Sequence, residues 1–517
     1  MRPRWRAGVL ISAANGTSGW DESADFIVVG FGAAGAAAAI TAAEHDASVI
    51  LLEKQPAEWH TPSTRASGGQ CTVVSDAERA VGYFDRCAGG LVPIEVSRAW
   101  VEAATTVVSW LEDVVGVKMI RVAGAEHPGW EGAGAVASFG TLEAYPWGDQ
   151  TRAMAMRQDA NAVPRISGGA SLFAALERAV GQRDRIGVRY EHPARRLIQD
   201  AAGRVTGVEA ATPTGTRRFG ARRGVVLTCG GYEYDDAMKL GYLRASPVYF
   251  YGSPMNTGDG VRMAQAVGAD LWHMNSMIGR AIAHVELDGK GYTYYVAVWP
   301  GGYVFTDKYG QRFANEHMQA MSRHDFYYEL INYDTARAEY PRIPCYWFFD
   351  QRRFSAAPIP TGTAAAGPHR YEWSPDSEAE IARGWVTRGD DLADVARRAG
   401  VADPEQAAAT IAAYNQGCRI QSDPFGRAPE SLIPLDQPPY YCMPLWPGGP
   451  NTSGGPRRNE HAQIIDVFGD PIPGLYEAGE LGEAVGALYP ANGGNISDAL
   501  CFGRIAVEHA LGQATGT

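Results

Sequence analysis

Several features that mark common classes of protein are scarce in this 517-residue chain. Its seven cysteines are scattered and include no Cys-x-x-Cys pair, which argues against a disulfide framework, a zinc or other metal site and a c-type haem, and favours a reducing cytoplasm. Basic charge is also scarce, with 46 Lys and Arg against 58 Asp and Glu and no basic block, so we expect no nucleic-acid partner. No stretch approaches the ~18 consecutive apolar residues that cross a bilayer, which predicts a soluble protein without a membrane span.

The length predicts two or three domains at ~100–200 residues each, every one large enough to bury a core. At the N-terminus, Arg2, Arg4 and Arg6 precede a short apolar patch at 7–14, as in a secretory signal, but the patch is at the low end of the expected length. We therefore interpret residues 1–23 as a disordered extension of a cytoplasmic protein.

A strand, a glycine-rich turn, a helix and a second strand follow one another next. Asp25–Val29 is an apolar run rich in β-branched residues, typical of a strand buried on both faces. Gly30–Gly35 has the spacing G-x-G-x-x-G and leads into an alanine-rich helix that ends near Ala43. The second strand, Ser48–Leu52, ends at Glu53, 23 positions after the first glycine. This arrangement predicts a dinucleotide site.

Each residue of this unit has a physical task in such a site. Gly30 permits the tight turn, Gly32 lets the backbone approach a pyrophosphate, and Gly35 lets the helix pack closely on the strand. The helix N-terminus offers N–H groups to the phosphates, and Glu53 can accept hydrogen bonds from ribose hydroxyls. The alternative is a glycine-rich turn that only packs helix against sheet.

Later glycine-rich segments favour FAD over NAD. They comprise a loop of small residues at 65–69, a buried strand at 224–231, a short strand with a terminal acid at 474–480, and the stretch 493–498, which leads into a predicted helix over 499–510. Both ends of the chain would therefore build the nucleotide domain. A helix N-terminus aimed at the site suits a flavin, because the N1–C2=O edge becomes anionic on reduction.

These segments resemble the flavoprotein family of fumarate reductases, urocanate reductases and 3-ketosteroid dehydrogenases. The resemblance covers nearly all of 24–511 and is most specific in the Gly-Leu-Tyr-x-Ala-Gly-Glu stretch that ends at Glu480 and in the stretch 493–504. It implies an α/β fold with a Rossmann-type FAD-binding domain over 24–276 and 439–517. It also implies an inserted α+β capping domain over 277–438.

The resemblance implies a set of cofactor-binding residues. In relatives with covalent flavin a histidine precedes the paired glycines, whereas this chain has Pro62 at the matching position and His60 out of register, which implies non-covalent FAD. The implied contacts are Gly30, Gly32, Ala33, Ala34, Gly35, Glu53, Lys54, Ser67, Gly68, Gly69, Ala194, Thr228, Gly230, Gly231, Asp259, Glu480, Asn495, Ser497 and Leu500.

The family's carboxylate-binding positions are uncharged here. Fumarate-type enzymes hold a dianion with arginine and histidine, because a dianion in a dry site must be matched by fixed cations. At the corresponding positions this chain has the segments Asn451–Gly455 and Tyr489–Gly494, which contain neither residue type. A small dianionic substrate is therefore not expected.

A tyrosine followed four residues later by a glycine replaces those cations. Ketosteroid dehydrogenases resemble this chain at Tyr489 and Gly493, where the resemblance implies that the hydroxyl and the backbone N–H bind the C3 carbonyl. Two such donors would favour enolisation, after which a base takes the α-proton and hydride leaves the β-carbon for flavin N5. The alternative is that Tyr489 packs beside a turn.

The base is expected in the capping domain. The family segment Gly310–Glu316 is followed in relatives by an arginine or a tyrosine just before an aspartate, and here His324 precedes Asp325. Tyr327 and Tyr328 are close enough in sequence to compete with His324 for this role. A histidine can accept a proton near neutral pH, but His324 could equally be structural and bond Asp325.

The sequence therefore predicts an FAD-dependent 3-ketosteroid dehydrogenase acting on a steroid-like apolar ketone with an unidentified electron acceptor. The stretch 492–498 favours the Δ4-(5α) type over the Δ1 type. One alternative is a fumarate- or urocanate-type enoate reductase in which Arg280, Arg323 or His317 binds the anion. Another is a flavin-binding protein without substrate chemistry.

Overall fold

The computed structural model describes residues 19–146, 148, 167–321, 323–360 and 371–512, and the chain divides into two compact units. Unit 1 comprises residues 1–242, 252–277 and 451–517, and unit 2 comprises residues 243–251 and 278–450. None of the helices that the structure describes has both the length and the apolar character that a bilayer crossing requires.

The centre of unit 1 is an eight-stranded sheet. Strand β1 (Glu22–Val29) pairs in parallel with β2 (Val49–Leu52) on one side and with β9 (Gly215–Leu227) on the other. The order is β19-β20-β9-β1-β2-β6, and β7 and β8 extend it from β9 as antiparallel strands. The other strands are β6 (Ile186–Arg189), β7 (Ala194–Gln199), β8 (Val205–Thr212), β19 (Gln463–Ile465) and β20 (Pro471–Glu477).

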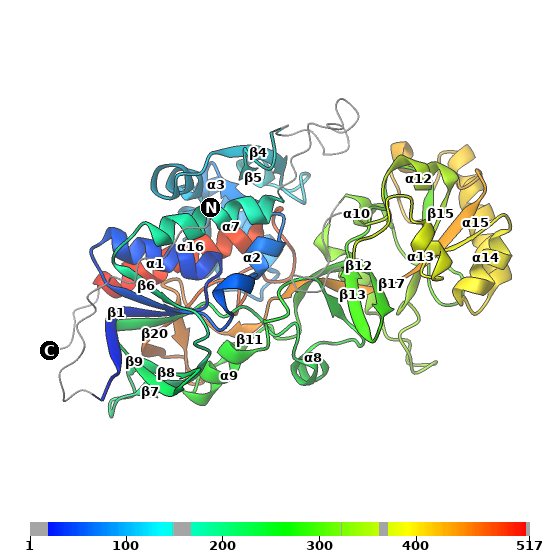
Figure 1. Cartoon of the computed structure of the whole chain (residues 1–517). Coiled ribbons are helices and arrows are strands. Elements are labelled where there is room, and N and C mark those ends of the chain that lie inside the picture. Colours follow the sequence, from blue (N-terminus) through cyan, green and yellow to red (C-terminus); the bar gives the residue numbers. More distant parts are fainter. Residues whose placement is uncertain (1–18, 147, 149–166, 322, 361–370, 513–517) are drawn as a thin grey trace. The chain divides into compact units, whose positions relative to one another are not determined.

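Three helices lie side by side on one face of this sheet (Figure 1). Helix α1 (Ala33–Glu44) packs against α7 (Gly168–Gly181) and α16 (Gly494–Gly512). The alanines of α1 are buried, and their small side chains let α16 approach closely. Both ends of the chain therefore meet in one Rossmann-type α/β unit, as the sequence predicts.

The remaining elements of unit 1 are short. An antiparallel sheet joins β3 (Cys71–Val74), β5 (Val136–Thr141) and β4 (Met119–Gly124). A second small sheet joins β11 (Leu271–Trp272) and β18 (Gly455–Pro456). The helices are α2 (Ser63–Ala66), α3 (Ala77–Ala88), α4 (Ile94–Ala104), α5 (Val107–Trp110), α8 (Asp236–Tyr242) and α9 (Asp259–Ala266), with shorter turns η1 (Ala57–Trp59), η2 (Leu111–Val115) and η3 (Ala133–Ala135).

Unit 2 is built on a seven-stranded sheet buried on both faces. Alternate residues of β15 (Cys345–Asp350) enter two different cores, with Trp347 and Phe349 on one face and Tyr346 and Phe348 on the other. The sheet order is β13-β12-β17-β15-β14, with β10 and β16 also paired to β17. The strands are β10 (Tyr249–Phe250), β12 (Met277–Leu287), β13 (Lys290–Tyr294), β14 (Tyr303–Thr306), β16 (Thr387–Gly389) and β17 (Tyr440–Thr452).

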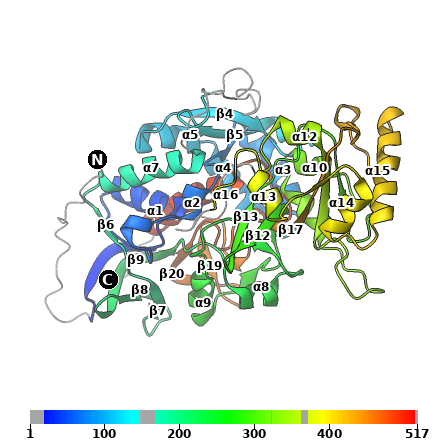
Figure 2. The ribbon, with the colours of Figure 1, turned by 45° about the vertical axis from the view of Figure 1, so that its right-hand side comes forward.

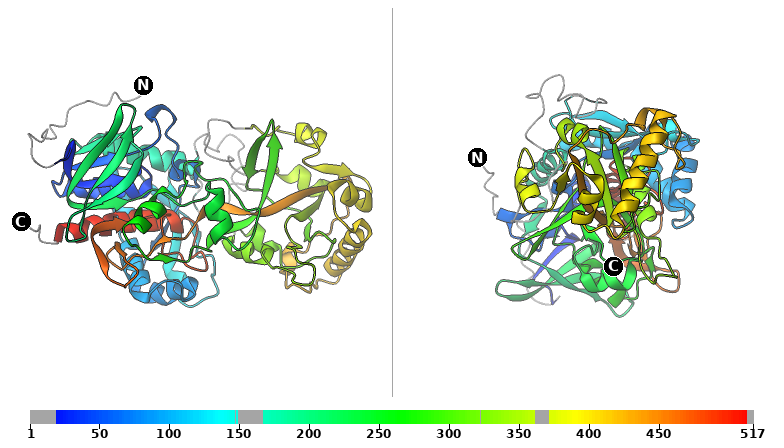
Figure 3. Two further views of the ribbon diagram at one scale, coloured as in Figure 1. Left: turned by 90° about the horizontal axis from the view of Figure 1, so that it is seen from below. Right: turned by 90° about the vertical axis from the view of Figure 1, so that its right-hand side faces the viewer.

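Helices cover the two faces of this sheet. Helices α14 (Leu392–Ala399) and α15 (Pro404–Arg419) lie side by side over the face of Tyr346 and Phe348, as Figure 2 and the right-hand view of Figure 3 show. The other helices of unit 2 are α10 (His317–Ala320), α11 (Tyr327–Leu330), α12 (Gln351–Ala356) and α13 (Glu378–Ala382), with turns η4 (His324–Phe326) and η5 (Pro429–Ser431).

The structure places three boundaries differently from the sequence analysis. Residues 243–251 and 439–450 belong to unit 2, because β10 pairs with β17 and β17 runs through the unit 2 sheet. At the N-terminus, residues 1–18 lie outside the described residues, but β1 already begins at Glu22 and the backbone N–H of Asp21 donates to Arg218 O. Residues 22 and 23, which the sequence analysis placed in the disordered extension, therefore belong to a strand.

Candidate active site

A cavity lies within unit 1 where the carboxyl ends of its parallel strands meet. Its walls come from the turn between β1 and α1, the ends of β2, β9 and β20, and the start of α16. Ligands of open α/β folds bind at this edge of the sheet, because the loops there diverge.

The first glycine of the turn has no room for a side chain. Gly30 has a left-handed φ of 108°, and a Cβ there would lie 2.3 Å from Thr228 O of the neighbouring strand end. The turn delivers the chain into α1, whose first-turn N–H groups have no intrahelical acceptor. Thr64 Oγ1 satisfies Ala33 N at 2.9 Å. The remaining N–H groups of this first turn are suited to bind an anionic ligand.

Glu53, at the end of β2, is held as an anion inside this cavity. Its Oε2 accepts from Phe31 N at 2.9 Å, its Oε1 accepts from Gln55 N at 2.8 Å, and His60 Nε2 lies 3.5 Å from Oε2. Burial alone would raise the pKa of Glu53, but His60 and the two backbone donors outweigh burial and lower it. A fixed carboxylate here can accept hydroxyl donors from a ligand.

Part of the predicted cofactor set lines the cavity. These residues are Gly30, Gly32, Ala33, Ala34, Glu53, Lys54, Ala194, Thr228, Gly230, Asp259, Glu480 and Asn495.

The other predicted residues are not among those that line the cavity. Ser67 Oγ accepts from Gly69 N, Ser497 Oγ accepts from Trp100 Nε1, and Leu500 is fully buried. Gly35, Ser67, Gly68, Gly69, Gly231, Ser497 and Leu500 do not line the cavity.

Tyr489 lies on the segment that leads into α16, and Gly493 is the residue directly before that helix. Tyr489 Oη accepts from Asn495 N at 3.0 Å, which fixes the ring against the first turn of the helix. A phenol hydroxyl can accept one hydrogen bond and donate another. Gly493 has a φ of 87°, and its N–H donates to no acceptor within the described part of the chain. The segment before α16 therefore carries two hydrogen-bond donors, the hydroxyl of Tyr489 and the backbone N–H of Gly493.

A segment that the sequence analysis did not identify holds this turn in place. Tyr83 Oη donates to Pro490 O at 2.6 Å, and Glu126 N donates to the same oxygen at 3.0 Å. His127 N in turn donates to Tyr83 Oη. Since Tyr83 lies about 400 positions from Pro490 and belongs to an ordinary amphipathic helix, no local pattern could reveal this role.

The three candidate bases all lie in unit 2, on η4 and α11. Nε2 of His324 contacts a guanidinium nitrogen of Arg280, which also lies over the Tyr295 ring. A guanidinium only donates, so Nε2 must accept there. Tyr327 is fully buried, whereas Tyr328 is 42% exposed. Burial raises the pKa of both phenols.

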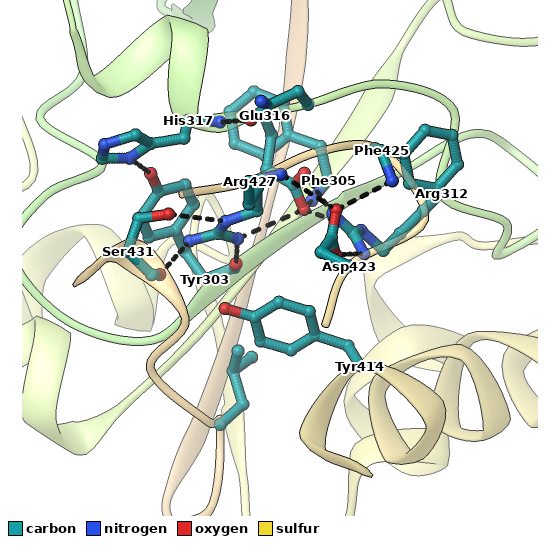
Figure 4. Close-up of polar contacts among 12 residues, drawn as sticks. Tyr303, Phe305, Arg312, Glu316, His317, Tyr414, Asp423, Phe425, Arg427 and Ser431 are labelled. Atoms are coloured by element: carbon teal, nitrogen blue, oxygen red, sulfur yellow. Dashed lines mark hydrogen bonds and ion pairs between the residues drawn. The ribbon is translucent and has the colours of Figure 1, made fainter. Parts of the chain in front are cut away.

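The family segment Gly310–Glu316 contributes to a charged cluster of unit 2, which we define as Arg312, Glu316, Asp423 and Arg427 (Figure 4). Arg312 lies 2.7 Å from Glu316 and 2.5 Å from Asp423, and Arg427 lies 3.5 Å from Glu316. All four side chains are buried, with two charges of each sign. This balance makes the cluster structural.

The anion-binding candidates have partners of their own. His317 Nδ1 lies 2.7 Å from Tyr303 Oη (Figure 4), and burial, with the charge of Arg427, lowers its pKa. Arg323 pairs with Asp325. These contacts disfavour an anion clamp built from His317 or Arg323.

Comparison with known proteins identifies the family. The model of the FAD binding domain family matches residues 25–496. The chain belongs to this family. It is an FAD-dependent oxidoreductase with an α/β Rossmann-type core.

Two curated relatives of this flavoprotein match over nearly their whole length. The chain is 27% identical to a 3-oxosteroid 1-dehydrogenase of Mycobacterium tuberculosis, covering 95% of this chain and 98% of the relative. It is 26% identical to a 4-oxocyclohexanecarboxylate 2-dehydrogenase of Sinomonas cyclohexanicum, covering 95% and 93%. Its fold is similar to that of a 3-ketosteroid delta1-dehydrogenase from Sterolibacterium denitrificans, with a TM-score of 0.79 at 23% identity over 94% and 99% of the chains.

The cavity of unit 1 fits the family's cofactor. The first turn of α1 suits the pyrophosphate, and Glu53 suits the adenosine ribose. His60, the histidine nearest the predicted attachment position, is enclosed by Phe31, Phe173 and Tyr190 beside Glu53, and it does not line the cavity. These contacts are consistent with the non-covalent FAD that the sequence predicts.

Proposed function

We propose that this flavoprotein dehydrogenates a ring ketone at the carbon pair next to the carbonyl, with a 3-ketosteroid as the preferred substrate class. Two curated relatives support the ketone, since their names describe different ring systems, a fused steroid and a single cyclohexane ring with a carboxylate, but share a ring carbonyl. Bound FAD would supply the hydride acceptor. The observation that carries the proposal is the pair of donors at Tyr489 and Gly493.

These two groups would bind the substrate's carbonyl oxygen. Negative charge develops on that oxygen when the α-proton leaves, and preorganised donors stabilise it. The hydrogen bond from Asn495 N polarises the Tyr489 hydroxyl and makes it a better donor. No ordering of the protein is then needed during the reaction, because the turn is already held through Pro490.

For the α-proton we propose Tyr327 or Tyr328 as acceptor. The contact with Arg280 uses the lone pair of His324 Nε2, which counts against His324. A tyrosine must ionise before it accepts a proton, and burial opposes this in both residues, whereas the charge of Arg244 lowers the pKa of each. Tyr327→Phe, Tyr328→Phe and His324→Gln, each with a pH profile of kcat, identify the acceptor.

The experiment for the function itself is a substrate panel. Purified enzyme with a dye acceptor is given saturated and Δ4 3-ketosteroids and 4-oxocyclohexanecarboxylate, and products are identified by mass and NMR. We expect dye reduction and a new double bond conjugated to the ketone. A new double bond between C1 and C2 would match the curated steroid relatives. A new double bond between C4 and C5 would match the Δ4-(5α) preference that the sequence predicts. Viologen oxidation by fumarate or urocanate without ketone turnover would refute the proposal.

A further inference from the structure

The side-chain amide of Asn256 links two carboxylates of unit 1, Glu233 and Glu480. Glu233 follows β9 and is fully buried, whereas Glu480 follows β20 and lines the FAD cavity. Nδ2 of Asn256 donates to Glu480 Oε2 at 3.0 Å, and the same amide hydrogen-bonds Glu233. Glu233 therefore lies behind Glu480, with Asn256 linking them.

The groups that contact this pair directly are neutral. Thr452 donates to Glu233 Oε1 from its backbone N–H at 2.7 Å and from its hydroxyl at 2.9 Å. Ser63 bonds Glu480. Glu233 Oε2 is buried and has no hydrogen-bond partner within the described residues. Among the residues that the structure describes, neither Glu233 nor Glu480 forms an ion pair.

The charged groups farther out do not compensate the pair. Glu483 adds another buried carboxylate beside Glu480. The buried Arg458 already faces Glu477 at 3.1 Å and also Asp498. Lys54, which also lines the cavity, pairs with Asp259 at 2.6 Å. The titratable phenol of Tyr234 lies near Glu233 and adds no positive charge.

Two neighbouring carboxylates without a cation, one buried and the other half-buried at the cavity wall, cannot both ionise at low cost. Burial raises the pKa of Glu233 to about 7. Burial first, and then the charge of Glu233, raises the pKa of Glu480 to about 8. Because the two groups interact, their titrations belong to the pair. FAD brings a pyrophosphate dianion into the same cavity, which adds negative charge.

We propose that Glu233 and Glu480 hold one proton between them and that FAD binding retains or recaptures this proton, so that FAD affinity is linked to pH near neutrality. FAD binding to the deprotonated pair then takes up one proton from water, and no electron is transferred. At low pH the pair holds its proton with or without FAD, and no linkage arises. As the pH rises through the titration of the empty pair, binding must take up a proton, so the Kd for FAD rises by up to tenfold per pH unit.

The test uses the purified holoenzyme. The enzyme is diluted in steps at pH values from 6 to 9, and released FAD is measured by the recovery of flavin fluorescence, which gives the Kd. For the wild type we expect the Kd to rise about tenfold or more between pH 6.5 and 8.5. Glu233→Gln should reduce this dependence, because it removes one of the two titrating carboxyl groups and also the charge that helps to raise the pKa of Glu480. Glu58→Gln, an exposed glutamate on η1, is the matched control and should keep the wild-type slope.

Two outcomes would overturn the proposal. One is a wild-type Kd that does not change over this range, and the other is an unchanged slope in Glu233→Gln, which would assign the linkage to another group such as the Glu53–His60 pair. Infrared spectra of the wild-type holoenzyme give a second measurement if Glu233→Gln does not fold. We expect a protonated-carboxyl band that shifts in D₂O at pH 7, and its absence would equally contradict the proposal.

Discussion

The charged cluster of unit 2 and the carboxylate pair Glu233 and Glu480 of unit 1 hold charge in opposite ways. In unit 2, Arg312 and Arg427 face Glu316 and Asp423, so each charge has a partner at hydrogen-bonding or ion-pair distance. In unit 1, the nearest groups to Glu233 and Glu480 are a backbone N–H, a side-chain amide and hydroxyls. A balanced cluster stabilises a fold, whereas an unbalanced one beside a ligand cavity responds to protons and to the ligand.

The largest expected contrast comes from two glycine substitutions that create similar clashes. Gly30→Ala places a Cβ 2.3 Å from Thr228 O, and Gly310→Ala places one 2.5 Å from Ala407 N, both at left-handed φ. We expect Gly30→Ala to lose most of its FAD and Gly310→Ala to keep it while lowering the Tm. FAD per chain after gel filtration and thermal melts measure this. Full FAD content in Gly30→Ala would contradict the site.

Breaking the balance in unit 2 should cost more stability than any change at an exposed pair. Glu316→Gln leaves two buried guanidinium groups with one carboxylate, and we expect a loss of about 3–5 kcal/mol in the free energy of unfolding. Glu378→Gln, which breaks the exposed pair with Arg388, is the control and should cost less than about 1 kcal/mol. Urea denaturation measures both. Equal small losses would show that the charged cluster is not structural.

Tyr489→Phe tests chemistry without disturbing the fold. The ring still packs on Gly494, but the donor is lost, so kcat for ketone dehydrogenation should fall by about 10²–10³ with FAD content unchanged. The exposed Tyr333 provides the control, and Tyr333→Phe should leave kcat within about twofold of wild type. A Tyr489→Phe enzyme with wild-type kcat would reduce this tyrosine to a packing role.

The smallest expected effect is the pH dependence of stability. The pKa of Glu233 is about 7 in the folded protein and near 4.5 in the unfolded chain, so unfolding releases a proton between these values. The wild-type stability from this group is therefore fully present below pH 4.5 and declines as the pH rises towards 7. Glu233→Gln should reduce the fall in Tm between pH 5 and 7.5. If Tm decreased by the same amount in Glu233→Gln, the pH dependence of stability would belong to other buried acids.

Local patterns predicted the start of unit 1 well. The β-branched run before Gly30, the glycine spacing and the alanine-rich helix each depend on neighbours in sequence, and β1, α1 and β2 form there. The helix predicted over 499–510 instead begins at Gly494. Its first residues have poor helix propensity but are buried, so packing determines where α16 begins.

Contacts between distant segments could not be predicted from the sequence. Asn256 and Glu480 lie 224 positions apart, and each by itself looks like a loop residue. The strand β10 has two residues and no apolar pattern to reveal its pairing with β17. Arg312 and Glu316 matched a family segment, but only the fold shows that Asp423 and Arg427 balance them.

The central claim is that this flavoprotein oxidises a ring ketone bound by Tyr489 and Gly493. Anaerobic rapid mixing of the wild type and Tyr489→Phe with a saturated 3-ketosteroid, followed by flavin absorbance, tests it most directly. The account predicts rapid bleaching in the wild type, bleaching slowed by about 10²–10³ in the variant, and one conjugated ketone formed per flavin. Equal bleaching rates, or bleaching only by compounds without a ring ketone, would contradict it.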